Sequence, residues 1–272
     1  MLNLEEIEFT IFDTETTGLQ PESGDRIVEI AGIRIRGNQR LGKFQSLVNP
    51  KRLISEPAFR VNQINQEMLK DAPEIKEVMP KFLEFIKGSI LCSYNASFDL
   101  GFLNYELSLM GKTLPLEILS IDILKMTQLL LPGLERYALD FVAERLGIHS
   151  QQLHRALSDV ELTLEVFFKL KEILRQKNIL DKDNLLSLFG LNCKSLQDII
   201  DQRLAQIQEA IDLGVKLKIR YLSGLDATVT ERQIIPRQIK KQNSHIYLIG
   251  YCCLRDQERT FRIDRILSLE II

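Results

Sequence analysis

EFTIFDTETTG, residues 8–18, is a short run of apolar and β-branched side chains that ends at Gly18. Such a run is typical of a buried β-strand that opens into a turn. Asp13 and Glu15 stand two positions apart near its end. Because the side chains of a strand alternate between its faces, both carboxylates project from the same face. The rest of the chain must build a core around this strand and a setting for two crowded acids.

The segments that follow predict a mixed sheet. RIVEIAGIRIRG (26–37) and KFQSLVNP (43–50) extend the first strand into an antiparallel three-stranded unit. Further strands are expected in ILCSY (90–94), which we predict to be parallel, and in ILSIDIL (118–124). Helical spacing of apolar residues alternates with these strands, over residues 74–88, 97–111, 134–147 and 154–174. This order indicates an α/β fold in which helices flank the sheet.

The remainder of the chain has a different character. Residues 179–203 are polar and helical in pattern, which suits a connector more than a core. After a helix that starts at residue 204, five short strand-like runs predict a small β-barrel. The runs are LKIRYLSG (217–224), TVTERQIIP (228–236), HIYLIGYCC (245–253), RTFRID (259–264) and ILSLEII (266–272). We therefore expect three parts, residues 1–178, 179–203 and 204–272.

Composition places the chain among ordinary globular proteins. Its 272 residues are 45% hydrophobic and 26% charged, which is enough for about two domains, each with its own core. The sequence has no run of about 18 apolar residues that could cross a bilayer. Its first residues also lack the basic and apolar segments of a secretory signal. We expect a cytoplasmic protein without a membrane partner.

Charge and cysteine content narrow the partners and the compartment. The net charge of -2 argues against a broad nucleic-acid coat, but residues 204–272 carry +3 and the preceding residues -5, so a local basic groove remains open. The four cysteines include no C-x-x-C pair, so we expect them to be reduced and mostly buried. They are Cys92, Cys193, Cys252 and Cys253.

The acid pair Asp13 and Glu15 is a candidate metal site. Two carboxylates on one face of a buried strand repel each other and resist desolvation unless a divalent cation neutralises them. Ligands that are all oxygen suit Mg²⁺ or Mn²⁺. The alternative is a solvated strand end that binds no metal.

Asp99 follows the strand at 90–94, at the edge of the sheet where sites of α/β folds gather. A structural role is the alternative. An aspartate in the first turn of a helix is stabilised by the helix dipole, and Asn95 or Ser97 could cap that helix.

His154 and Asp159 stand in HRALSD, where His154 falls at a helix start and Asp159 faces inward. On a helix, Asp159 shares a face with Ala156 and Thr163, small residues that allow close approach to the sheet. The alternatives are a solvated His154 and an ion pair between Asp159 and Arg155.

These acids stand in three ordered motifs, FDTETTGL (12–19), YNASFD (94–99) and HRALSD (154–159). Together with EPAFRVNQINQEMLKDAP (56–73), they resemble the DEDDh exonucleases, which belong to the ribonuclease-H-like superfamily and include polymerase proofreading exonucleases. The resemblance covers about residues 7–175. It implies a ribonuclease-H-like mixed sheet and hydrolysis of phosphodiester bonds.

The same resemblance implies roles for the acids. Two Mg²⁺ or Mn²⁺ ions would be held by Asp13, Glu15 and Asp159, with Asp13 bridging them and Asp99 holding the second ion partly through water. His154 would be the general base, since an imidazole of ordinary pKa accepts a proton near neutral pH.

Three residues are implied to meet the substrate. The main chain at Thr16 and the carboxylate of Glu15 would contact the terminal 3′-hydroxyl, and Leu19 would wedge against the last base. Phe98 would help to shape the pocket for terminal bases. The alternatives are loop packing for Leu19 and a core position for Phe98. The second motif departs from the family, since it begins with Tyr94 where His is common.

The segment HIYLIGYCCLRDQERTFRIDRI (245–266) resembles the WYL domain, a small Sm-like β-barrel, although Ile246 replaces the Trp of the family's name. Pro236 is expected after the second strand. Planar guanidinium groups bind phosphate through paired hydrogen bonds, so four arginines are candidates for an anion or nucleic-acid site. They are Arg220, Arg232, Arg262 and Arg265. The alternative is a solvated edge that pairs with Asp264 and Glu258.

These inferences predict an enzyme that removes nucleoside monophosphates from the 3′ end of single-stranded DNA or RNA. Expected partners are single-stranded or 3′-ended nucleic acid and a polymerase or another nucleic-acid-processing protein. A rival prediction is a ligand-sensing regulator or polymerase accessory protein whose exonuclease fold serves as a binding module. Among enzymes, the rival is a dinucleotide or short-RNA exonuclease.

Overall fold

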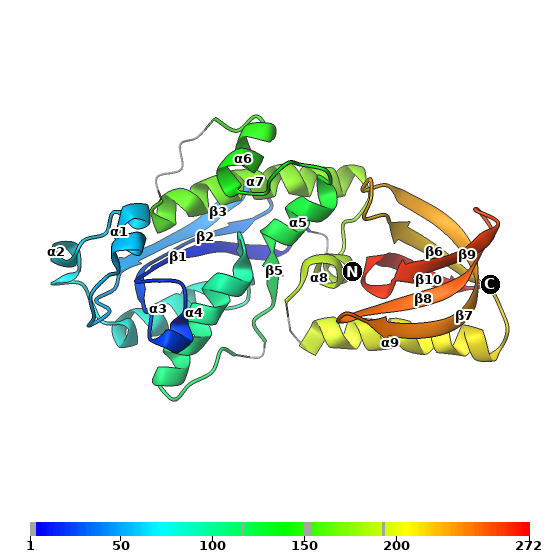
Figure 1. The fold of residues 1–272 in the computed structure, drawn as a ribbon, viewed down its shortest axis with the longest axis horizontal. Coiled ribbons are helices and arrows are strands. Elements are labelled where there is room, and N and C mark those ends of the chain that lie inside the picture. Colours follow the sequence, from blue (N-terminus) through cyan, green and yellow to red (C-terminus); the bar gives the residue numbers. More distant parts are fainter. Residues whose placement is uncertain (1–3, 116, 150–153, 192–193) are drawn as a thin grey trace.

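The computed structural model describes residues 4–115, 117–149, 154–191 and 194–272, and within these it has two five-stranded sheets (Figure 1). The strand order of the first sheet is β3-β2-β1-β4-β5. Its strands are β1 (Glu8–Thr16), β2 (Ile27–Arg36), β3 (Gln39–Leu47), β4 (Ile90–Ser93) and β5 (Ser120–Asp122). The first three pair antiparallel, whereas β4 is parallel to β1 and β5 is parallel to β4. The predicted antiparallel start and parallel fourth strand are confirmed.

Helices cover both faces of this sheet (Figure 1). The described helices are α1 (Glu56–Asn62), α2 (Gln66–Leu69), α3 (Ile75–Ile86), α4 (Ala96–Leu109), α5 (Ile123–Leu130), α6 (Leu139–Arg145), α7 (Ala156–Gln176), α8 (Lys182–Phe189) and α9 (Lys194–Asp212). Because side chains of β1 alternate, Phe9 and Ile11 pack with α7, while Phe12 packs with α3 and α4 on the other face. Asp13 and Glu15 continue the alternation of Phe9 and Ile11, so they project toward α7.

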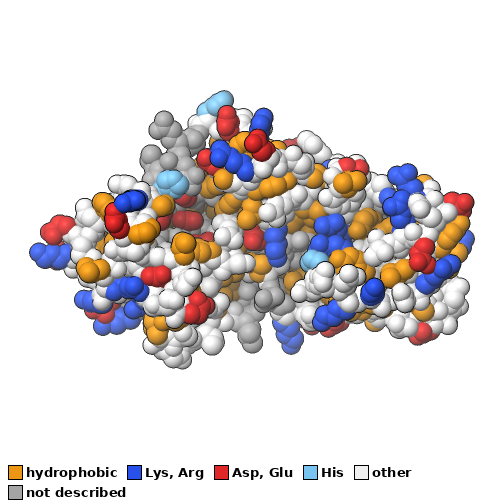
Figure 2. Space-filling model, in the orientation of Figure 1, with side chains coloured by type: hydrophobic (Ala, Val, Ile, Leu, Met, Phe, Trp, Pro, Cys, Tyr) orange, Lys and Arg blue, Asp and Glu red, His pale blue; other side chains and the backbone are white. Residues whose placement is uncertain are grey.

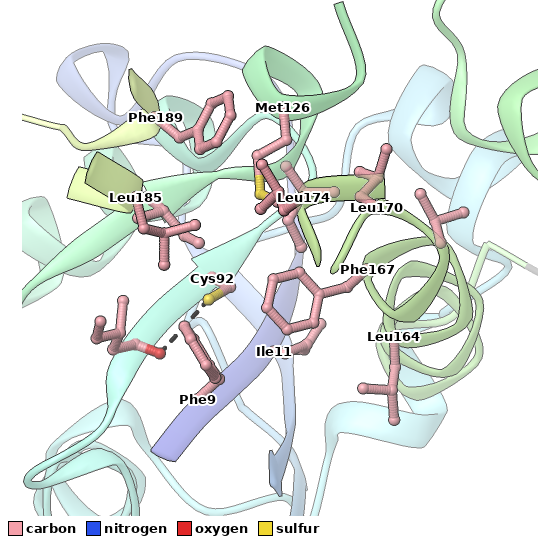
Figure 3. Packing of buried hydrophobic residues seen from close by; sticks show 14 of the residues in the cluster. Phe9, Ile11, Cys92, Met126, Leu164, Phe167, Leu170, Leu174, Leu185 and Phe189 are labelled. Atoms are coloured by element: carbon pink, nitrogen blue, oxygen red, sulfur yellow. Dashed lines mark hydrogen bonds between the residues drawn. The ribbon is translucent and has the colours of Figure 1, made fainter. Parts of the chain in front are cut away.

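Aromatic packing holds α7 against β1. The rings of Phe9 and Phe167 meet edge to face with centroids 5.1 Å apart, inside the buried cluster that Figure 3 shows. Leu164 and Leu170 of the same helix belong to this cluster. The contact fixes α7 across the strand that carries the first two acids.

The prediction that residues 179–203 suit a connector more than a core is wrong for α8. Leu185, Leu186 and Phe189 are fully buried in the cluster on the α7 face. The segment reads as polar because Asp181 caps the helix through the backbone N–H of Asn184 at 2.8 Å, so polar residues gather in its first turn. The apolar face behind that cap belongs to the core.

Two predicted elements are shorter than expected. The strand predicted over 118–124 ends at Asp122, because this carboxylate accepts the backbone N–H of Leu124 at 2.9 Å and starts α5. The helix predicted over 134–147 begins only at Leu139. Before it, the backbone carbonyl of Tyr137 accepts a hydrogen bond from the Tyr94 hydroxyl at 2.7 Å. Side-chain partners thus replace helical ones in both places.

The second sheet is antiparallel throughout, with strand order β10-β6-β7-β8-β9. Its strands are β6 (Leu217–Leu222), β7 (Val229–Gln242), β8 (His245–Cys252), β9 (Gln257–Arg262) and β10 (Ile266–Ile271). Helix α9 packs along it and buries Ile207 and Ala210 against the sheet (Figure 1). All five predicted strands are present among the described residues.

Two details of this sheet differ from prediction. Pro236 lies inside β7, where the register of the β7–β8 ladder shifts between Pro236 and Gln238, and not after the strand. A bulge of this kind tolerates a residue without a backbone donor. A barrel was expected, but among the described residues β9 and β10 are the edges of the ladder, joined by a short 3₁₀ turn at Ile263–Arg265.

The two sheets share apolar contacts. Leu222 of β6 and Leu267 are buried in the core of the first sheet, not in that of the second. The buried guanidinium of Arg203 on α9 donates to Asn184 Oδ1 at 3.0 Å and also contacts the Ser187 hydroxyl. Ser187 in turn donates to the backbone carbonyl of Asp264 at 2.8 Å. The junction between the sheets is therefore packed and hydrogen-bonded.

Two further predictions concern the membrane and the cysteines. In the described ranges, we find no helix with the length and apolar character needed to cross a bilayer. Cys92 and Cys252 are buried free thiols, whereas Cys253 is exposed. Cys193 lies outside the described residues.

Candidate active site

Three acids converge at the end of β1. Asp13 and Glu15 from the strand and Asp159 from α7 each place one carboxylate oxygen so that all three oxygens lie within 4.8 Å of one another. Oxygens bound to one divalent cation at about 2.0–2.6 Å lie no more than about 4–5 Å apart. Three hard oxygen ligands at this spacing fit Mg²⁺ or Mn²⁺. The β1–β2 ladder shifts register between Glu15 and Thr16, a local irregularity that is common beside active sites.

The electrostatics of this group favour a cation. Burial, followed by the charges of Asp159 and Glu29, raises the pKa of Glu15 to about 8. Burial and the charges of Asp99 and Glu15 raise the pKa of Asp13 well above its ordinary value. Without a cation, the cluster relieves its repulsion by holding protons.

Asp99 lies beside the cluster and is fully occupied by protein donors. One of its oxygens accepts the backbone N–H and the hydroxyl of Thr14, at 2.9 and 2.7 Å, and the other accepts the Ser93 hydroxyl at 2.5 Å. Burial raises the pKa of Asp99 to about 6, against these hydrogen bonds. Asn95 is at the helix cap but its side chain makes no capping bond. Asp99 therefore ties the start of α4 to β1 and β4.

His154 is exposed, has a φ of 46°, and directly precedes the first residues of α7. Its ring nitrogens are not part of the converging ligand group. The next residue is firmly held, since Arg155 donates to both oxygens of Glu29, at 2.9 and 3.0 Å. The alternative in which Arg155 pairs with Asp159 is therefore not what the structure shows.

Glu29 is a site residue that the sequence analysis missed. It is fully buried on β2, stands opposite Glu15 in the ladder, and accepts the backbone N–H of Ala156 at 3.2 Å. Gln45 adds a bond at 3.0 Å. The signal was present in RIVEIAGIRIRG, where Glu29 shares a face with the buried Ile27 and Ala31. A charge on such a face needs a partner.

Asn62 is a second missed residue. Its side-chain amide donates to the backbone carbonyl of Thr16 at 3.3 Å, and a hydrogen bond from Asn62 partly counteracts the rise in the pKa of Glu15. Asn62 is the last residue of α1, inside the stretch 56–73. It links that stretch to the end of β1.

The three residues predicted to meet substrate differ in exposure. Thr16 is buried and its hydroxyl donates to the carbonyl of Gly18 at 2.5 Å. Leu19 is 78% exposed, so the alternative of loop packing is wrong for it. Phe98 is half-buried against Phe102, with ring centroids 5.0 Å apart, which agrees with a core position.

The four arginines predicted as one anion site have separate partners. Arg220 donates to the carbonyls of Lys177 and Asn178 at 3.4 Å, and Arg232 donates to the Thr230 hydroxyl at 3.0 Å. The predicted set is therefore not one cluster.

Arg262 and Arg265 alone of these four line the same pocket among the described residues. Arg262 pairs with Asp264, as the solvated-edge alternative expects, but Glu258 pairs with Arg237.

Comparisons with known proteins cover both sheets. Residues 10–167 match the family model described as an exonuclease, and residues 202–271 match the WYL domain. The chain is 39% identical to the DNA polymerase III subunit epsilon of Treponema pallidum, over 60% of this chain and 76% of that protein. It is 38% identical to the PolC-type DNA polymerase III of Caldanaerobacter subterraneus, over 63% of this chain. The chain spans only 12% to 18% of the length of its PolC-type relatives.

Solved structures share the fold. Exonuclease X in complex with 5′ overhanging duplex DNA is 26% identical and aligns over 70% of this chain and 98% of that one, with a TM-score of 0.51. The nuclease domain of 3′hExo, a DEDDh family member bound to rAMP, is 20% identical over 66% of this chain and 98% of that one, with a TM-score of 0.56.

Proposed function

Because this chain belongs to the DEDDh exonuclease family, we propose that it is a metal-dependent 3′–5′ exonuclease. It would hydrolyse phosphodiester bonds at the 3′ end of single-stranded DNA or RNA and release nucleoside monophosphates. One observation carries the proposal: three carboxylate oxygens of Asp13, Glu15 and Asp159 lie within 4.8 Å of one another. Such a group is costly unless it binds cations.

The metal site would use the acids in different ways. Asp13, Glu15 and Asp159 would hold the ions directly, with Asp13 shared between two of them. Bound Mg²⁺ or Mn²⁺ supplies Lewis-acid stabilisation of the scissile phosphate and of the leaving oxygen. Asp99 already accepts three protein hydrogen bonds, so its contribution would be to orient Thr14 and to add negative charge beside Asp13.

His154 would accept the proton of the attacking water. An imidazole suits this role near neutral pH, and the residue is exposed where a substrate could approach. The bidentate pair between Arg155 and Glu29 would hold this position relative to Asp159.

Substrate contacts would come from the loop after β1. The exposed Leu19 is available to wedge against the last base, and the buried Thr16 would present its main chain to the 3′-hydroxyl. The face of Phe98 that the core leaves open would support the terminal bases. The polymerase names of the relatives support a replication polymerase as partner.

The test is release of mononucleotides from a 3′-labelled single strand. Asp13→Asn should lower the rate by at least about 100-fold and leave folding intact, because it removes a repulsive buried charge. Glu22→Gln, an exposed acid on the neighbouring turn, is the matched control and should stay within about twofold.

Chelation of divalent ions should stop the wild-type reaction in the same assay. Full activity of Asp13→Asn, or activity in chelator, would contradict the proposed site. Matched DNA and RNA strands labelled at either end would show the direction and the sugar preference. If the wild type binds strands but degrades none of them, the rival prediction of a binding module or regulator takes its place.

A further inference from the structure

A pocket lies at the junction between the two sheets. It encloses about 640 Å³ and is lined by α5, by α8 and α9, and by the edge of the second sheet. Ligand pockets in proteins measure roughly 300–1,000 Å³, so this one has room for a nucleotide-sized molecule. In Figure 2, basic side chains and a histidine gather over this region.

The lining is strongly basic. It contains four Lys or Arg side chains, Lys125, Lys241, Arg262 and Arg265, and a single carboxylate, Asp264. Asp264 is already paired with Arg262, whose Nε lies 3.1 Å from Oδ1. Within the part of the chain that the structure describes, the other three cations form no ion pair. Positive charge is therefore in excess inside the pocket.

These cations face one another across the junction. His245 lies in the same pocket, and burial together with the charges of Arg262, Arg265 and Lys125 lowers its pKa, while Asp264 opposes the shift. Lys125 belongs to α5 of the first sheet's domain, and the others belong to the second sheet. A charge cluster that spans two domains is costly unless an anion joins it.

Gly224 gives Arg265 its place. A Cβ atom at residue 224 would lie 1.9 Å from Nη1 and 2.5 Å from Cζ of Arg265, so the guanidinium rests on a backbone that bears no side chain. The turn before β7 thus leaves the Arg265 guanidinium in the pocket. Arginine in such a position can offer paired donors to a phosphate.

We propose that the junction pocket binds the phosphate group of a nucleotide, with Lys125, Lys241 and Arg265 as its cationic ligands and with both domains contributing to one site. The apolar side chains of Leu129, Leu188 and Ile246 border the pocket and offer a surface for a base. The nucleotide could be free, or it could be part of a nucleic-acid strand. That the ligand is a nucleotide rests in part on the proposed exonuclease function, whereas the anion site itself does not.

Binding can be measured apart from catalysis. In chelator, the converging carboxylates at the end of β1 repel phosphate, so binding then reports on the junction pocket. The probes are deoxyadenosine monophosphate, followed by calorimetry, and a fluorescein-labelled oligothymidylate strand, followed by anisotropy. Both use the full chain at low ionic strength.

Arg265→Gln and Lys125→Gln should each weaken binding by about tenfold. Lys240→Gln is the matched control, since Lys240 is exposed beside Lys241 on β7 but points to the other face and does not line the pocket. It should change binding by less than about twofold. Gly224→Ala keeps every charge and displaces Arg265, so it should also weaken binding.

Loss of mononucleotide binding in the pocket variants supports a free nucleotide as the ligand. Loss confined to the oligothymidylate strand supports a strand phosphate. Affinities for both probes that are the same in the wild type, Arg265→Gln and Lys125→Gln overturn the proposal, as does the absence of binding by the wild type. None of these results depends on strand cleavage, so failure here is distinguishable from failure of the exonuclease proposal.

Discussion

At the scale of single residues, the acids at the end of β1 are held in a state that water alone would not favour. Glu15 and Asp13 have raised pKa values because they are buried and because Asp159, Glu29 and Asp99 surround them. In such a site a metal ion and protons compete for the same oxygens. The stability of the protein should therefore depend on pH and on metal together.

Without metal, the free energy of unfolding should fall as the pH rises from about 5 to about 8. The pKa of Glu15 is about 8 in the folded protein and 4.5 without its surroundings, so the folded state binds more protons in this window. Stability conferred by that proton is complete below the unfolded pKa and is lost as the pH passes the folded one. Urea unfolding in chelator measures the slope.

Glu15→Gln should flatten that slope, and saturating Mg²⁺ should raise stability at pH 8 more than at pH 5. An equally steep fall in Glu15→Gln would show that the acids at this site do not govern the titration.

At the scale of elements, α7 (Ala156–Gln176) carries the site. Its middle packs on β1 through Phe167, and its start is held by the buried carboxylate of Glu29. Further along, the buried Lys171 donates to the carbonyl of Gly37 at 3.1 Å. A helix held at several points can place Asp159 against β1 with little freedom, and such rigidity is what metal ligands require.

Glu29→Gln should destabilise the fold by about 3–5 kcal/mol and reduce nuclease activity, because it leaves Arg155 without its buried partner and loosens the start of α7. Glu161→Gln is the matched control on the same helix. Glu161 pairs with Arg40, but both side chains are more than a third exposed, so its loss should cost about 0–1 kcal/mol.

Denaturant unfolding and the strand-cleavage assay measure the two effects of this change. If the two variants behave alike, Glu29 is not an anchor of α7.

At the scale of the molecule, two sheets share one junction. Leu222 and Leu267 from the second sheet are buried in the first core, and Arg203 bonds to both α8 and the turn before β10. The Lys177 ammonium adds a bond to the carbonyl of Ala227 at 2.5 Å. Such contacts couple the unfolding of the two sheets.

The full chain should therefore unfold in one calorimetric transition, and Arg203→Ala should separate it into two. The arginine is buried, so its removal leaves Asn184, Ser187 and the Ile263 carbonyl without their donor. Arg237→Ala, which removes an exposed pair with Glu258, is the control and should keep one transition. Two transitions in the wild type would refute the coupling.

Local patterns in the chain were sufficient for much of this protein. The alternation in residues 8–18 placed Asp13 and Glu15 on one face, and the order of the three motifs matched the family that the comparisons show. The antiparallel start, the later parallel strands and the five C-terminal strands were also predicted correctly. Periodicity and turn residues report on near neighbours in the chain, and these features depend on near neighbours.

Other features depend on residues that are distant in sequence. The pair between Arg155 and Glu29 joins positions 126 residues apart, and α8 belongs to a core that its own polar first turn conceals. The junction pocket exists only because α5 and the second sheet meet. No periodicity encodes such meetings, because they follow from how buried faces pack together, and packing is settled by the whole set of contacts at once.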